Sequence, residues 1–228
     1  MFYLFFLKDK RSRPLSTQIL FFIAGFAAYQ YLGTIIKPLI PQLEYKVLFD
    51  RLLLLVVIFS LALHASLNRQ RFWRYFKKPE WNQRVYFPYI WHGFHSIKAL
   101  HYVIISFACS LLVFIPFIVL RDAEVTYSLL TFAILFSVIN SLFEEIIWRG
   151  AWLGGLRERY GTAFALFISS IGFGLQHMSF GIPFTISLLF SIGASFFAVT
   201  VLKTNSIYPA IIWHLFINIG MVLSGFIL

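Results

Sequence analysis

The chain has 228 residues, of which 60% are hydrophobic and 12% are charged, and its formal net charge is +10. This composition excludes a soluble globular domain of the same length and is typical of a helical protein that crosses a membrane several times. The basic residues stand in short stretches between apolar runs, so we expect them to face an anionic membrane surface, and we expect no nucleic-acid partner.

Seven apolar runs predict an all-α fold, a polytopic transmembrane helix bundle with about seven spans, because about 20 residues in a helix cross a bilayer core. An eighth span or a re-entrant segment remains open. No repeat or Ser/Gly-rich linker divides the chain, so residues 1–228 are predicted to form a single membrane domain. Within it, 1–120 would hold the N-terminal spans and 125–228 a catalytic helix core. The predicted spans are roughly 16–36, 48–67, 98–120, 125–149, 162–178, 183–203 and 206–228.

The distribution of basic residues predicts the orientation of the helices. Lys8, Lys10, Arg11 and Arg13 precede the first run, which is long enough to span and has no small-residue cleavage site, so we expect a retained first helix. With the N-terminus in the cytosol, most basic residues, Arg149 among them, fall in cytosolic loops. Under the positive-inside rule the C-terminus then lies on the opposite side. The basic residues expected on that opposite side are Lys37, Lys46, Arg51 and Arg121.

The loop 68–97 mixes basic and aromatic residues, a composition that suits a segment lying in the plane of the lipid headgroups. A stacking surface for single-stranded nucleic acid would use similar residues, but the apolar composition of the chain disfavours it. The single cysteine, Cys109, lies in an apolar run and is expected only to pack.

Two adjacent carboxylates, Glu144 and Glu145, lie within the fourth apolar run. An ionisable side chain near the bilayer centre costs roughly 2.5–3.5 kcal/mol on insertion scales, so the pair indicates a function. On a helix Glu145 and Arg149 share a face in the favourable order for an ion pair, and Glu144 is left to face a cavity, with Asn140 one turn before it. The alternative is that both carboxylates pair with arginines at the cytosolic interface.

Two later runs carry histidines that the helix pattern relates to this site. Glu144 lies 16 residues before Tyr160 and His177 lies 16 after Gly161, so a helix turn at Tyr160-Gly161 would bring them to the same depth, with Phe173 beside the imidazole. The alternative is a histidine that only packs.

His214 and Asn218 are four residues apart in the last run, so they share a helix face and offer two donors or two metal ligands. The remaining histidines have no such partner and are expected to pack or to lie at the interface; they are His64, His92, His95 and His101.

Taken together, three ordered motifs resemble the CAAX protease and bacteriocin-processing (CPBP/Abi) family of intramembrane proteases. They are E-E-x-x-x-R from Glu144 to Arg149, F-x-x-x-H from Phe173 to His177, and H-x-x-x-N from His214 to Asn218. The R-G after the second glutamate and F-G-L-x-H around His177 also look like the family. The resemblance covers 140–220, and residues 1–120 carry none.

The resemblance implies a peptidase in which Glu144 and His177 activate a water that attacks a peptide carbonyl. His214 and Asn218 would stabilise the oxyanion, while Glu145 and Arg149 would support the site. No cofactor is expected, because Asn is a poor zinc ligand and a good oxyanion donor. The alternative is a zinc enzyme with Glu144, His177 and His214 as ligands.

The expected partners are the lipid bilayer and a peptide or protein substrate, which could be lipidated or membrane-anchored. A prenylated CAAX tail, a leader-bearing peptide and a protein with a sorting signal all remain open as substrates. The alternative functions are a catalytically silent scaffold or immunity protein of the same fold and a proton-coupled transporter.

Overall fold

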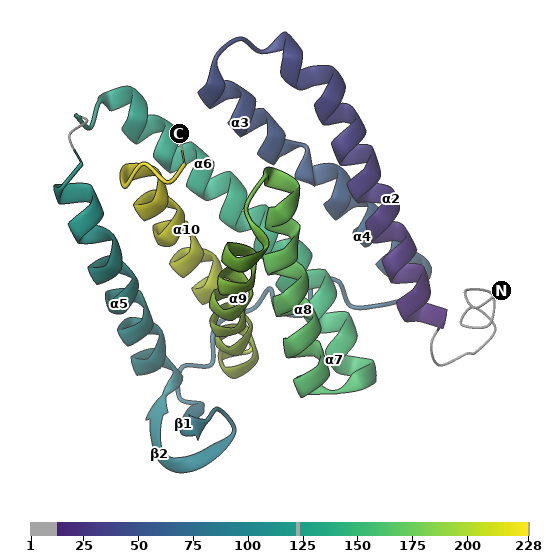
Figure 1. Ribbon diagram of the computed structural model, residues 1–228. Helices are drawn as coiled ribbons and strands as arrows, with labels where there is room; N and C mark the ends of the chain where they lie inside the picture. The colour runs from purple at the N-terminus through teal and green to yellow at the C-terminus, as the bar shows by residue number, and fades with distance from the viewer. Residues whose placement is uncertain (1–12, 122–123, 228) are drawn as a thin grey trace.

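The computed structural model describes residues 13–121 and 124–227, and it is a bundle of helices with one small hairpin (Figure 1). The predicted all-α bundle is confirmed. The helices are α2 (Arg13–Ile36), α3 (Leu43–Leu52), α4 (Leu54–Leu67), α5 (Ala99–Val119), α6 (Tyr127–Glu145), α7 (Gly154–Tyr160), α8 (Thr162–Gln176), α9 (Phe184–Thr204) and α10 (Tyr208–Leu223).

Three shorter helical pieces complete the bundle. A 3-10 turn at Lys37–Leu39 follows α2, and another at His177–Phe180 follows α8. Between α6 and α7 the chain continues as a π-helix over Ile146–Leu153, so α6, this π-helix and α7 form one continuous helical rod.

The helix ends follow from local sequence chemistry. The Thr126 hydroxyl accepts a 3.2 Å hydrogen bond from the Leu129 amide and caps the start of α6. Gly161 has φ +84°, which only glycine adopts without strain, and it makes the predicted turn between α7 and α8. Asn205 takes a left-handed conformation with φ 54° and ends α9.

Six helical stretches within the described residues are long and apolar enough to cross a membrane: Leu15–Leu39, Leu43–Leu67, Ala99–Val119, Tyr127–Tyr160, Thr162–Phe180 and Phe184–Thr204. They correspond to the first six predicted runs. The second and fourth are longer than predicted, because α3 continues into α4 and because α6 continues through the π-helix into α7.

The seventh predicted span, 206–228, is only partly confirmed. Its helix α10 has 16 residues, which is about 24 Å at 1.5 Å per residue and less than a typical bilayer core of about 30 Å. The chain is therefore a multi-pass membrane protein by the length and composition of six helices, with α10 as a shorter apolar helix.

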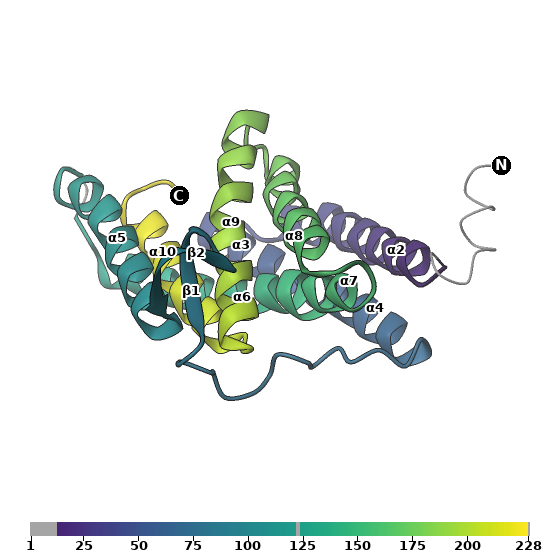
Figure 2. The same ribbon diagram turned by 90° about the horizontal axis from the view of Figure 1, so that it is seen from below.

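The loop 68–97 contains regular structure that the sequence prediction missed. Strands β1 (Arg84–Tyr89) and β2 (His92–Lys98) pair antiparallel, with Arg84 opposite Lys98. The hairpin lies at one end of the bundle in Figure 1, and Figure 2 views the bundle from that end. Val85 is buried in a small cluster with Ala99, Tyr102 and Val199. Alternating β-branched and aromatic residues favour a strand as much as an interfacial segment. In this chain, packing against α5 and α9 stabilises the strands.

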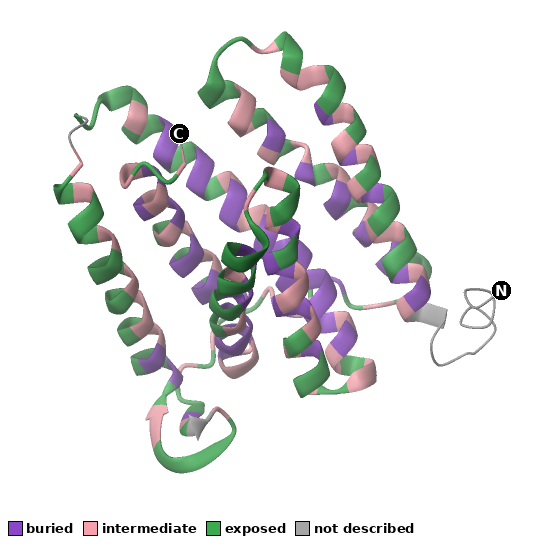
Figure 3. Cartoon of the chain, in the orientation of Figure 1, coloured by how far each residue is buried: buried purple, intermediate pink, exposed green. Residues whose placement is uncertain are grey.

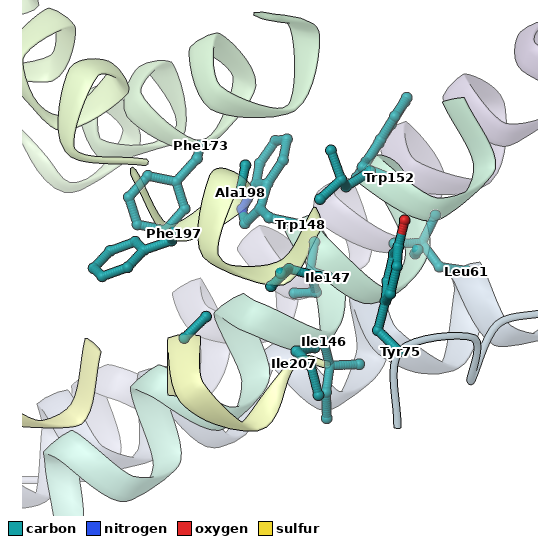
Figure 4. Close-up of a cluster of buried hydrophobic side chains, with 14 of the residues drawn as sticks. Leu61, Tyr75, Ile146, Ile147, Trp148, Trp152, Phe173, Phe197, Ala198 and Ile207 are labelled. Carbon is teal, nitrogen blue, oxygen red and sulfur yellow. The ribbon is translucent and has the colours of Figure 1, made fainter. Parts of the chain in front are cut away.

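Burial divides the bundle into an apolar outer surface and a buried centre (Figure 3). The outward side chains of α5 are largely exposed, as expected for a helix that faces lipid. At the centre, Trp148 from the π-helix packs against Phe173 of α8, which lies beside Phe197 of α9, and Trp152 stacks on the other side of Trp148 (Figure 4). This aromatic cluster holds together the three segments that carry the candidate site.

The predicted basic N-terminus lies mostly outside the described residues, since Lys8, Lys10 and Arg11 precede Arg13, where α2 begins.

Candidate active site

The carboxylates Glu144 and Glu145 end α6, and Arg149 follows in the π-helix. All three side chains are buried, with exposed fractions of 0%, 0% and 1%. π-helical segments are rare and are frequently found at functional sites. The π-helix here begins directly after the two carboxylates, so the irregular backbone and the buried charges coincide.

The predicted ion pair between Glu145 and Arg149 is present, with 3.1 Å between Glu145 Oε1 and an Arg149 guanidinium nitrogen. The same Glu145 oxygen lies 3.0 Å from His214 Nδ1. Arg149 also donates a 2.9 Å hydrogen bond to the Ala194 carbonyl of α9. The guanidinium lies 4.7 Å from the centre of the Phe173 ring.

The prediction that places Arg149 in a cytosolic loop is therefore wrong, because the residue lies inside the bundle. The ion pair with Glu145 and the hydrogen bond to Ala194 offset part of the cost of burying a guanidinium. Arg149 thus ties α6, α8 and α9 together.

The carboxylate of Glu144 is surrounded by donors. The amides of Asn140 and Gln176 donate to it at 3.3 and 3.4 Å. His214 Nε2 lies 3.7 Å from Glu144 Oε2. The predicted placement of Asn140 on the same face is confirmed, and the turn at Tyr160-Gly161 brings α8 against the Glu144 helix as expected.

Glu144 also has an arginine partner that the sequence prediction assigned elsewhere. A guanidinium nitrogen of Arg51, from α3, lies 3.6 Å from Glu144 Oε1. The guanidinium lies 4.0 Å from the centre of the Phe180 ring and is held over it. The sequence predicts Arg51 only as one of the charges on the side opposite the cytosol, and that side stays a prediction. The Arg51 side chain lies in the bundle rather than at a membrane surface, because α3 carries it toward Glu144.

His177 begins the 3-10 turn after α8 and is partly buried. Its Nδ1 lies 2.9 Å from the Phe173 carbonyl oxygen. A carbonyl only accepts, so Nδ1 carries the proton and the Nε2 of the neutral ring is left as an acceptor. The Phe173 ring packs against the imidazole at 5.0 Å between centres, as predicted.

His214 and Asn218 occupy one face of α10, and both are buried. The His214 ring stacks on Phe197 at 5.0 Å between centres. The Asn218 side-chain nitrogen is buried and has no hydrogen-bond partner among the described residues. A buried donor without a partner is costly, so this nitrogen is a candidate for binding an oxygen that comes from outside the chain.

One cavity of about 700 Å³ connects these groups. Most of its lining is apolar, with residues from α3, α5, α6, α8, α9 and α10. Its polar walls include Arg51, Cys109 and five of the predicted positions, and Phe173 also lines it. Those five are Asn140, Glu144, His177, His214 and Asn218. Glu145 and Arg149 are not in the lining, which fits a supporting place behind the wall.

Comparison with known proteins gives one match. A model of the family described as type II CAAX prenyl endopeptidase Rce1-like matches residues 126–220, a little over two fifths of the chain. No curated protein and no solved structure matches the chain.

The chain is similar to the Rce1-like family over residues 126–220. The resemblance predicted from the three motifs is thereby confirmed, and with the six apolar helices it supports a membrane endopeptidase in general terms. The Rce1-like region extends from the residue that caps α6 to the last turn of α10, so it contains the π-helix and every predicted site residue.

Two residues of the site were missed by the sequence prediction. Arg51 lies outside the Rce1-like region. The only feature of the sequence that could have indicated its role is a charge at the start of an apolar run. Gln176 occupies the variable position of F-G-L-x-H. It accepts a 2.8 Å hydrogen bond from the Trp148 indole and donates to Glu144, so it orients the carboxylate.

The zinc alternative requires Glu144, His177 and His214 to converge on one ion. Among residues 13–121 and 124–227, no group of three or more His, Cys, Asp or Glu side chains is placed to hold a metal ion. Zinc dependence stays open to the measurement of metal content and to chelation.

Proposed function

We propose that the chain is an intramembrane endopeptidase that hydrolyses a peptide bond with a water activated between Glu144 and His177. The observation that supports this most strongly is that the buried Glu144 carboxylate and His177, whose Nε2 is left as an acceptor, line the same cavity. An ionised carboxylate and a neutral imidazole nitrogen are both proton acceptors, which a water nucleophile requires.

The chemical steps follow from these groups. Glu144 takes a proton from the water while His177 Nε2 accepts a hydrogen bond from the same molecule and orients it. The water oxygen bonds to the peptide carbon, and the carbonyl becomes an oxyanion. The Asn218 amide donates to that oxyanion, as does His214 Nε2 when the ring carries its second proton. Glu144 then returns the proton to the leaving nitrogen as the C–N bond breaks.

The mostly apolar lining fits a substrate that reaches the site from within the bilayer. We place the cleavage near the cytosolic face, with the N-terminus in the cytosol, from the distribution of basic residues.

The test is cleavage of membrane proteins in cells that express the wild type, Glu144→Gln or Glu44→Gln. Gln keeps the volume of Glu144 but takes no proton, and Glu44 is an exposed residue of α3 that serves as the matched control. Mass spectrometry of new protein termini should find a product that is lost with Glu144→Gln and retained with Glu44→Gln. Turnover of that substrate by purified Glu144→Gln would exclude Glu144 as the base.

We further propose that the peptidase needs no metal, so its activity should survive prolonged incubation with a strong zinc chelator. Metal content is measured on the same purified sample. Stoichiometric zinc, with activity lost on chelation and restored by added zinc, would contradict the metal-free mechanism and assign Glu144, His177 and His214 as ligands.

A further inference from the structure

A second cavity, of about 1050 Å³, lies at the end of the bundle where α4 ends and where α7 turns into α8 (Figure 1). It shares no lining residue with the candidate active site. Its walls come from the end of α4, the segment 70–77, α7 and the turn after α9. The lining residues are Ala62, Ala65, Ser66, Gln70, Arg71, Phe72, Trp73, Arg74, Lys77, Arg157, Glu158 and Asn205.

The charge of this cavity is strongly positive. Four of its residues are basic, and Glu158 is its only acidic residue, so the lining has a net charge of +3. Arg74 pairs with Glu158, and Arg157 donates to the Tyr75 hydroxyl at 3.3 Å. These contacts fix two of the guanidinium groups at the wall. Arg71 is exposed, so its guanidinium is free to turn toward a ligand.

Gln70 also lines the cavity. Its side-chain nitrogen is buried and has no hydrogen-bond partner among the described residues. A buried N–H without a partner is destabilising, and rotation of the Gln70 side chain toward an acceptor in the cavity would supply the partner. A phosphate offers several acceptor oxygens and a negative charge, which match Arg, Lys and amide donors together.

The place of the cavity indicates where such a phosphate would come from. The segment 68–77 follows directly on α4, the end of a candidate span, and Trp73 beside the cavity is 58% exposed. Tryptophan at the end of a spanning helix is typical of the headgroup level, and basic groups there attract anionic lipids. A lipid phosphate would therefore reach the cavity without leaving the membrane surface.

We propose that this cavity binds the phosphate group of an anionic glycerolipid, with Arg71 and Gln70 as donors that turn to it. Lys77 is the third donor and exchanges its exposed 3.4 Å pair with Glu80 for the phosphate. The site goes beyond the proposed peptidase activity and is independent of it. It gives the chain a specific lipid contact on the face where basic residues gather.

The test uses native mass spectrometry of the full-length protein in a neutral detergent, titrated with phosphatidylglycerol and, separately, with phosphatidylcholine. The variant Arg71→Gln/Lys77→Gln removes two charges from the cavity. The matched control Arg69→Gln/Lys78→Gln removes two charges from the same segment at residues that do not line it. Thermal melts establish that both variants are folded, and Arg71→Lys/Lys77→Arg retains the charge of the cavity.

We expect one phosphatidylglycerol to bind per protein. Its affinity should be roughly tenfold weaker in the cavity variant, because two solvent-exposed charged contacts are lost. The control and the charge-retaining variant should bind like the wild type, and phosphatidylcholine should bind more weakly. If phosphatidylglycerol binding weakens equally in the cavity variant and in the control, the proposed site is wrong. The lipid would then be attracted to the positive charge of the whole segment. If inorganic phosphate at the same concentration displaces the lipid, the site binds free phosphate, and a lipid is not the source of the phosphate group.

Discussion

At the residue scale, the site is organised around two buried carboxylates with different surroundings. Glu145 faces Arg149 and His214 behind the cavity wall, whereas Glu144 lies at the wall among Asn140 and Gln176. The two side chains are neighbours in sequence but point to different partners because they are about 100° apart on the helix. The carboxylate of Glu145 is thus engaged in structural contacts, whereas that of Glu144 is available to a ligand in the cavity.

Arg51→Gln should lower peptidase turnover by roughly tenfold or more, since a charge-assisted contact is worth about 1.5–3 kcal/mol. Arg51 lies 3.6 Å from Glu144 Oε1, so its loss leaves the carboxylate less well positioned. Arg51→Lys should restore part of the rate, because the charge returns. Rates are measured with the substrate that the Glu144→Gln comparison identifies.

Lys46→Gln removes a charge from the same helix at a residue that does not line the cavity, and it serves as the control. Wild-type turnover by Arg51→Gln would show that the contact has no role in the reaction.

Glu145→Ala should reduce stability more than Glu144→Ala does. It removes the ion-pair partner of Arg149, which is 1% exposed, and breaking a buried pair costs about 3–5 kcal/mol. Glu144→Ala instead leaves Arg51 beside a cavity, where water can reach it. Thermal melts of both variants in detergent decide this, and equal melting temperatures would mean that the Glu145–Arg149 pair is not structural.

At the element scale, the site depends on how closely α8 approaches α9. Gly174 lies in α8, three residues before His177, and it faces Ser187 and Ser191 of α9. A Cβ at this position would lie 2.6 Å from the Ser191 backbone nitrogen and nearer still to other atoms of the two serines. Small residues of this kind let membrane helices approach closely, and here that approach fixes the position of His177.

Gly174→Ala should destabilise the protein by about 1–3 kcal/mol, the usual cost of overpacking a close contact. It should also impair the peptidase, because α8 carries Phe173, Gln176 and His177. Gly193→Ala on α9 is the matched control for the thermal melt only, since a Cβ there meets nothing within 4 Å but the residue lines the active-site cavity. A thermal melt of Gly174→Ala that matches the wild type would contradict the close packing of the two helices.

At the scale of the whole molecule, α2 begins at one end of the bundle and α10 ends at the other (Figure 1). The turn between α7 and α8 and the turn between α9 and α10 lie at the lower end of the bundle in Figure 1, where the hairpin also lies. The residues that line the basic cavity gather at this same end. One end of the bundle is therefore rich in positive charge, which agrees with a cytosolic face under the positive-inside rule.

The N-terminus should be cytosolic, and the C-terminus should lie on the opposite side of the membrane. Reporter fusions at each end, with one reporter active only in the cytosol and another active only outside it, measure this directly. If both ends lie on the same side, the prediction is wrong. The number of crossings is then even, which is expected if the 16-residue α10 does not cross the membrane.

The sequence by itself determined the helices, the three motifs and the ion pair between Glu145 and Arg149. Apolar runs of span length permit little except helices in a membrane, and residues four apart on a helix share a face whatever surrounds them. The family match agrees with those local patterns. These features depend on neighbours within one helix, so they can be predicted without knowing how the helices pack.

Only the tertiary structure decided which distant residues complete the site and how the longer segments fold. Arg51 reaches Glu144 across 93 positions of the chain, and Gln176 reaches it across 32. The hairpin in 84–98 depends on packing against other helices, and so does the π-helix after Glu145, which is buried along its whole length. Such contacts arise from the packing of helices against one another, and the periodicity of a single segment does not contain that information.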